Sequence, residues 1–168
     1  MDIAPPGVLE AFPERTMVAC MADMELALRR AASSGLIDYT TGQSGFTVRP
    51  DASLNEAQQK ALAHMNQRLE EAGGTGLSRL LDEVLFDQLQ HIVVYPVQDE
   101  SHWVDGDGRV LPDAFVVPDG LHAKALAGRV HTDLEAGFIR GVDGRTRRVV
   151  GADHELSDGD VLKIHAKS

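Results

Sequence analysis

Few residues in this chain are spaced for a recognisable reaction. No G-x-x-x-x-G-K-[ST] pattern occurs in the 168 residues. That pattern supplies the backbone amides and the lysine that hold nucleotide phosphates. The glycine-rich stretch 73–76 lacks the lysine and is better suited to end one helix and begin the next. We therefore expect no catalytic residue and no hydrolysis of a nucleoside triphosphate by this chain.

Two patterns begin like metal sites and then depart from them. His154 starts an H-E-x-x-H sequence, but Asp158 stands at the fifth position. Residues 105–108 start like a calcium loop, but arginine and valine follow where a ligand and a glycine belong, so a hairpin turn is predicted. We expect His131 to bond the end of a helix. The sequence predicts no metal site and no cofactor.

One group of charges has a functional interpretation. Four arginines fall within nine residues: Arg140, Arg145, Arg147 and Arg148. Guanidinium groups bind phosphate with two parallel hydrogen bonds, so RNA is a candidate ligand. The alternative is a solvated turn balanced by Asp143 and Asp153. Trp103 could stack on a base, but in a small sheet it is better interpreted as core.

Composition limits the partners and the compartment. The net charge is −10, with 16 Asp, 12 Arg and only 4 Lys. This balance argues against a general nucleic-acid coat and suggests a halophilic source. Cys20 is the only cysteine, which excludes an intramolecular disulfide and favours a reducing compartment. Because no signal sequence or membrane-spanning apolar run is present, we expect a cytoplasmic protein with no membrane contact.

The first 40 residues predict an incomplete α/β domain. Two prolines at 5–6 can open a short helix, residues 16–20 suggest a buried strand, and a second helix begins near Asp23 and stops at Gly35. One strand cannot build a parallel sheet by itself. We assign residues 1–40 to one end of an incomplete domain.

Residues 41–91 predict a connector and two helices. A capping box at Ser53 and Glu56 opens the first helix, which ends near Gly73. The second helix carries an apolar stripe from Leu77 to Leu89. The two helices either form an antiparallel hairpin or dock on the preceding α/β segment.

Residues 92–168 alternate short strands, one helix and Asp-Gly turns. Strands are predicted at 92–97, 115–117, 138–139, 149–150 and 161–164, with a helix from about 121 to 130. One helix packed across a small mixed sheet satisfies this order. The whole chain is therefore an α+β protein that ends in a β-grasp domain.

Several stretches of this chain resemble a known family. The C-terminal ones resemble a TGS domain: LPDAFVVPDG at 111–120, VHTD at 130–133, GFIR at 137–140 and VGADHELSDGDVLKI at 150–164. Together with ELALRRA at 25–31, SGLIDYTTGQSGF at 34–46, FDQL at 86–89 and IVVYPVQDESHWVDGDG at 92–108, they are similar to the archaeal form of the YchF, or Obg-like ATPase, group. The similarity spans essentially the whole chain.

This resemblance implies that residues 1–40 are the C-terminal end of a P-loop NTPase domain. It also implies two base-contact positions. Asp2 would stand at the aspartate of the Asn-Lys-x-Asp motif, and residues 21–23 would form the second base-contact loop, with the amide of Ala22. The phosphate loop and the switch segments of the family would precede Met1. Met21 replaces a hydroxyl side chain, His122 replaces a helix-capping threonine, and Gly128 falls within a helix. These departures suggest a truncated or decaying copy.

Three functions follow as hypotheses. The first is the non-catalytic C-terminal portion of a translation-associated GTP- or ATP-binding protein, whose TGS module binds RNA or the ribosome. The second is residual purine-nucleotide binding through Asp2 and Ala22, or complementation of a separate NTPase half. The third is a regulatory TGS module that senses a ligand.

Overall fold

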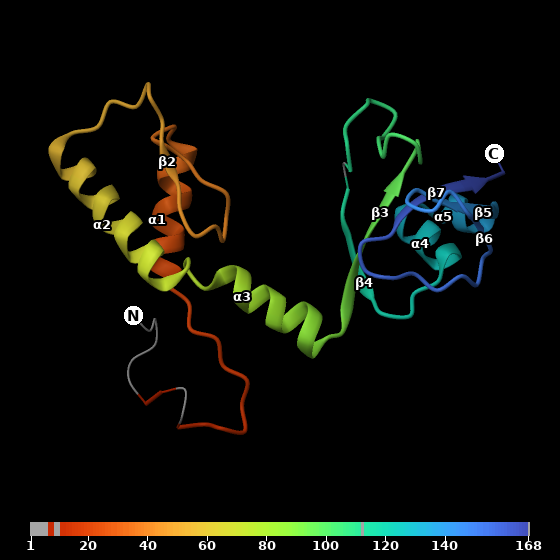
Figure 1. The fold of residues 1–168 in the computed structure, drawn as a ribbon, viewed down its shortest axis with the longest axis horizontal. Coiled ribbons are helices and arrows are strands. Elements are labelled where there is room, and N and C mark those ends of the chain that lie inside the picture. The colour runs from red at the N-terminus through yellow and green to blue at the C-terminus, as the bar shows by residue number, and fades with distance from the viewer. Residues whose placement is uncertain (1–6, 9–10, 112, 168) are drawn as a thin grey trace. The chain divides into compact units, whose positions relative to one another are not determined.

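The computed structural model describes residues 7–8, 11–111 and 113–167 (Figure 1). The chain divides into two compact units, Met1–Val84 and Leu85–Ser168. None of the helices in the described ranges has the length and apolar character needed to cross a membrane. The finer division at residues 40 and 91 stays a prediction.

The first unit is mostly helical. Its elements are α1 (Ala22–Ser33), β1 (Ile37–Asp38), β2 (Thr47–Val48), α2 (Glu56–Ala72) and α3 (Leu77–Asp82), after which a π-helical turn, η1 (Glu83–Gln88), leads into the second unit. The end of α1 is as predicted, because Gly35 adopts a left-handed backbone with φ +71°. The strand predicted at 16–20 is wrong. These residues have no neighbouring strand in the described chain, and β structure needs one. The helix predicted from the prolines at 5–6 lies outside the described residues.

A capping box opens α2, but it lies two residues beyond the predicted position. Asn55 is the N-cap: its Oδ1 accepts the Gln58 amide at 2.9 Å, and the Gln58 side chain accepts the Asn55 amide at 2.9 Å. Asparagine caps as well as serine, and glutamine can replace glutamate, so the sequence offered two overlapping boxes. Gly73 ends α2 with φ +71°, as predicted.

The core of the first unit joins α1, β1 and α2. Leu28, Ile37, Leu62 and Leu69 form a buried cluster. The packing partners of α2 are therefore α1 and β1, so of the two arrangements predicted for α2, docking on the α/β segment is the one observed. The apolar stripe beyond Leu77 is largely exposed; for example, Leu81 is 48% and Leu89 is 53% accessible.

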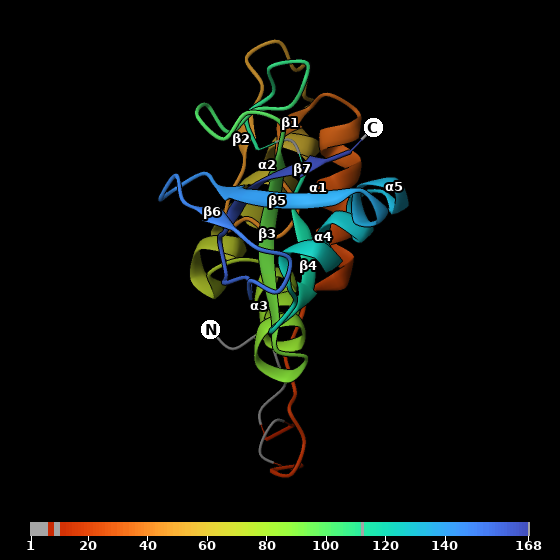
Figure 2. The same cartoon turned by 90° about the vertical axis from the view of Figure 1, so that its right-hand side faces the viewer.

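The second unit is a five-stranded mixed sheet with two helices. Its elements are β3 (His91–Val97), β4 (Phe115–Pro118), α4 (Ala123–Val130), α5 (Thr132–Ala136), β5 (Phe138–Asp143), β6 (Val149–Val150) and β7 (Val161–Ala166). The strand order is β4-β3-β7-β5-β6. The central pair β3 and β7 is parallel, and the other pairs are antiparallel. Figure 2 shows the strands of this unit together with α4 and α5.

Packing of α4 on one face of the sheet confirms the β-grasp prediction. Leu126 of α4 lies in one buried cluster with Val94, Val117 and Leu162, which come from three strands. The sequence did not predict α5 as a separate helix. His131 both ends α4 and caps α5, where its Nδ1 accepts the Asp133 amide at 3.2 Å. His131 therefore has a structural role, as predicted, but its side chain bonds the start of α5 and not the end of α4.

The two departures in α4 have visible consequences. His122 is the N-cap of α4 and makes no capping bond with its side chain. A Cβ at Gly128 would run into the Glu135 carboxylate of α5. The helix glycine therefore leaves room for the Glu135 side chain.

Candidate functional site

Residues 98–111, in the loop from β3 to β4, contact β7 and the turn between β5 and β6. We call it the cross-loop. Strand side chains alternate between faces, so Val161 and Lys163 lie opposite the core residue Leu162. Trp103 lies against that second face. Its Nε1 donates to the Gly144 carbonyl at 3.1 Å, and a Cβ at Gly144 would lie 3.0 Å from both Trp103 Nε1 and Val161 Cγ1. Trp103 is half-buried and belongs to neither buried cluster, so it packs on the second face of the sheet and not in the core as predicted.

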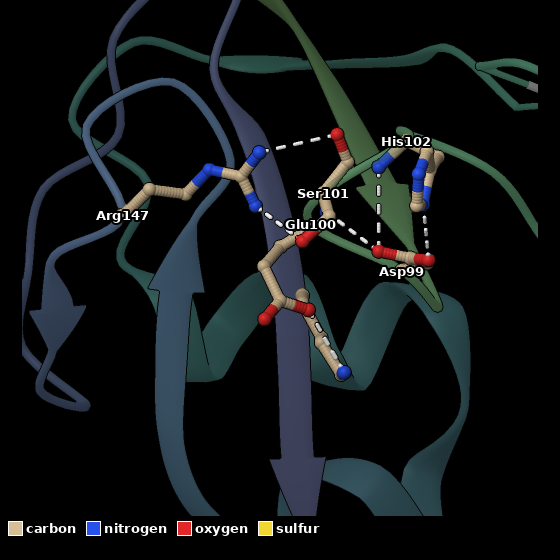
Figure 3. A network of polar contacts seen from close by, with 6 residues as sticks. Asp99, Glu100, Ser101, His102 and Arg147 are labelled. Atoms are coloured by element: carbon tan, nitrogen blue, oxygen red, sulfur yellow. Dashed lines mark hydrogen bonds and ion pairs between the residues drawn. The ribbon is translucent and has the colours of Figure 1, made fainter.

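Polar contacts fasten the cross-loop to the sheet (Figure 3). Lys163 Nζ lies 2.8 Å from Glu100 Oε2. Arg147 donates from Nη1 to Ser101 Oγ at 2.6 Å and from Nη2 to the Ser101 carbonyl at 3.1 Å. The loop therefore has three points of attachment: Trp103, Lys163 and Arg147.

Asp99 organises the start of the cross-loop. Its Oδ1 accepts the Ser101 amide at 2.6 Å, and its Oδ2 lies 2.8 Å from His102 Nδ1. The hydrogen bond with His102, followed by that with the Ser101 amide, lowers the pKa of Asp99 to about 2. Asp99 is thus ionised at neutral pH and holds the turn in one shape.

Two of the four arginines belong to this framework. Arg145 donates from Nε to the Gly159 carbonyl at 2.9 Å, and its guanidinium lies 5.6 Å from the centre of the Trp103 ring. Arg147 holds Ser101. Both side chains are oriented by contacts within the unit before any ligand arrives.

The other two arginines are placed differently. Arg140 and Arg148 are exposed, and within the described ranges neither side chain has a hydrogen bond or ion pair. Arg140 stands on β5 opposite His165 of β7, and the Arg148 carbonyl accepts the Asp143 amide at 2.9 Å just before β6. The Asp143 carboxylate instead bonds Arg145 and Thr146 amides and the Thr146 hydroxyl. It shapes the turn rather than pairing with an arginine side chain.

Both predicted base-contact residues fall within the sequence range of the first unit. Asp2 lies outside the described residues. Ala22 is the first residue of α1, where backbone amides have no acceptor within the helix. Met21, the N-cap, offers no side-chain cap, and its amide donates to the Thr75 carbonyl at 2.8 Å. No local pattern indicates Thr75 as the partner of Met21, because 54 residues separate the two positions.

Comparison with known proteins adds a family to this geometry. Residues 1–99 match the model of the Obg-like GTPase YGR210-like, G4 motif-containing domain, and residues 108–166 match that of the TGS domain. The chain is 39% identical over 153 residues to an uncharacterized GTP-binding protein, MJ1332, of Methanocaldococcus jannaschii, covering 91% of this chain and 38% of the relative.

A solved structure shows the same relationship. The crystal structure of a GTP binding protein from Pyrococcus horikoshii matches with a TM-score of 0.63 and 33% identity, over 96% of this chain and 40% of that one. The chain thus spans about two fifths of the length of these relatives.

Proposed function

The chain belongs to the YGR210-like group of Obg-like GTPases and carries a TGS domain, and from this premise we propose that its 168 residues act by docking on RNA or the ribosome. Phosphoryl transfer requires a phosphate loop and a magnesium ligand, and the G-x-x-x-x-G-K-[ST] pattern is absent from this sequence. In this proposal the chain is the non-catalytic C-terminal portion of a translation-associated GTP- or ATP-binding protein.

The observation that carries the proposal is the division of the arginines. In a chain of net charge −10, Arg140 and Arg148 are exposed without a side-chain partner in the described residues. Their neighbours Arg145 and Arg147 are held by the cross-loop and its surroundings. Free guanidinium groups are the ones able to form bidentate bonds with phosphate. We assign the docking contacts to Arg140 and Arg148. Arg145 and Arg147 support the neighbouring loops.

The test is cosedimentation of the chain with ribosomes. The variant Arg140→Ala/Arg148→Ala removes the two charges proposed for docking and no side-chain hydrogen bond or ion pair within the described residues. Its matched control, Lys124→Ala/Arg129→Ala, removes the same charge from exposed positions of α4 in the same unit. We expect the first variant to remain in the supernatant and the control to pellet like the wild type. Equal pelleting of both variants would remove the assignment, and no pelleting of the wild type would remove the function.

Binding of a purine nucleotide is the second candidate. Two observations favour it: residues 1–99 match a G4 motif-containing domain of Obg-like GTPases, and the relatives are named for GTP binding. The proposed contacts are Asp2 and the Ala22 amide, used by the chain alone or together with a separate NTPase half. Titration with GTP and ATP, followed by NMR up to millimolar concentration, tests the first version; mixing with the complementary half tests the second.

A further inference from the structure

Thr75 holds the start of α1 from two sides. It is 0% exposed and lies in the turn between α2 and α3. Its carbonyl accepts the Met21 amide at 2.8 Å, and its hydroxyl donates to Glu25 Oε2 at 2.7 Å. Met21 immediately precedes α1, and Glu25 lies one turn into it. One residue thus fixes both the entry of the helix and its first turn.

Glu25 is a buried carboxylate at the centre of this junction. It is 7% exposed, and the Tyr39 hydroxyl donates to the same Oε2 at 2.7 Å. The Tyr39 oxygen in turn accepts the Gly42 amide at 3.1 Å. Burial, together with the hydrogen bond to Glu25, raises the pKa of Tyr39 to about 12, so the phenol stays protonated and donates. Two hydroxyl groups therefore converge on one carboxylate oxygen.

The backbone on either side is fitted just as closely. Gly76 has φ +85°, and a Cβ there would overlap the Ala19 carbonyl. The Cys20 thiol donates to the Gly76 carbonyl at 3.4 Å. Residues 19–21 therefore lie directly against residues 75–76, and the chain enters α1 along a fixed path.

Stability alone does not account for this arrangement. Glu25 Oε1 is buried and has no hydrogen-bond partner within the described residues. Leaving a buried carboxylate oxygen unpaired is destabilising, and an apolar residue of similar volume at this position of α1 would avoid that cost. The carboxylate instead fixes the orientation of the first turn of α1. Its Oε2 accepts one hydrogen bond from Tyr39, which follows β1, and one from Thr75 in the α2–α3 turn.

We propose that Thr75 and Glu25 are positioning residues for a purine-contacting loop at residues 21–23. Neither touches the base; they fix the Ala22 amide at the helix start in the orientation that a base edge requires. This inference rests on the second candidate function above and adds to it the residues that set base preference. A loop whose backbone is anchored at Met21 discriminates between bases only while that anchor holds.

The experiment compares three variants of the full 168-residue chain. Thr75→Val removes the hydroxyl and keeps the shape and the carbonyl, whereas Thr75→Ser keeps the hydroxyl. Ser78→Ala is the matched control, because its hydroxyl bonds the Gly42 carbonyl at 3.0 Å and not α1. NMR measures hydrogen exchange of the Met21 amide and the dissociation constants for GTP and ATP in the same samples.

Thr75→Val should speed exchange at Met21 by about tenfold, the effect expected for losing a hydrogen bond to a charged group. It should also change the ratio of the two dissociation constants, which a loss of general stability would leave constant. Thr75→Ser and Ser78→Ala should match the wild type in both. If Thr75→Val lowers the folded fraction, Tyr39→Phe, which removes the other bond to Oε2, serves in its place.

The possible failures are distinguishable. Unchanged exchange at Met21 overturns the anchor, and faster exchange with an unchanged ratio overturns its role in base preference; in both cases the wild type still binds nucleotide. Absence of saturable binding by the wild type overturns the nucleotide-binding candidate and this inference together.

Discussion

Replacing Arg147 with alanine should loosen the cross-loop. The side chain makes two hydrogen bonds to Ser101, at 2.6 and 3.1 Å. A typical internal hydrogen bond contributes about 0.5–1.5 kcal/mol net, and these two are exposed to water. We therefore expect Arg147→Ala to lower the free energy of unfolding by about 1 kcal/mol in total. The backbone at 147 has φ +63°, which disfavours alanine and arginine alike, so the change isolates the side chain.

Urea denaturation followed by tryptophan fluorescence measures this effect. Trp103 is the only tryptophan, and it lies within the cross-loop, so its emission reports the region that the mutation affects. The control is Arg148→Ala, the next residue, which loses no side-chain contact within the described chain. An unchanged midpoint for Arg147→Ala, or an equal shift in both variants, would refute the fastening role of Arg147.

Three further outcomes are expected. The pKa of Asp99 is lowered to about 2, so its ionised carboxylate stabilises the cross-loop fully above the unfolded pKa of about 3.9, and this stabilisation is lost as pH falls. Trp103 fluorescence should therefore change between about pH 4 and pH 2. Asp99→Asn should abolish that transition. Gly76→Ala should destabilise the first unit by more than about 1 kcal/mol, because the new Cβ would meet the Ala19 carbonyl. Gly35→Ala, where the Cβ would enter open space, should cost about 1 kcal/mol. Urea denaturation followed by circular dichroism compares the two variants. Molar KCl should raise the thermal midpoint if the net charge of −10 reflects a halophilic source, and a midpoint independent of salt would contradict that origin.

Local patterns predicted the second unit well and the first unit less well. Each strand of the β-grasp domain is a short β-rich run bounded by turn residues, so its position depends on neighbours in sequence. The stretch 16–20 has the same composition, but no second strand lies beside it in the described chain, and composition cannot supply one.

Long-range contacts explain what sequence could not show at the candidate sites. Four arginines close together in sequence were interpreted as one group. The fold separates them, because Ser101, Trp103 and Gly159 take up two of the side chains. Thr75 was interpreted only as part of a helix break between glycines. Its partners Met21 and Glu25 lie 54 and 50 residues away in the sequence, so no local pattern predicts these contacts.

The cross-loop also limits the surface of the second unit, which carries the TGS domain, that a nucleic acid could contact. A strand of RNA laid across the broad face of the sheet would first have to displace Trp103 and the Lys163–Glu100 pair. If RNA is contacted only through Arg140 and Arg148, as proposed, about two phosphates are neutralised. For a single strand that corresponds to a log–log slope of affinity on salt of about −1.4. Attachment with so shallow a slope would persist at ionic strengths that strip more highly charged RNA-binding proteins from their targets.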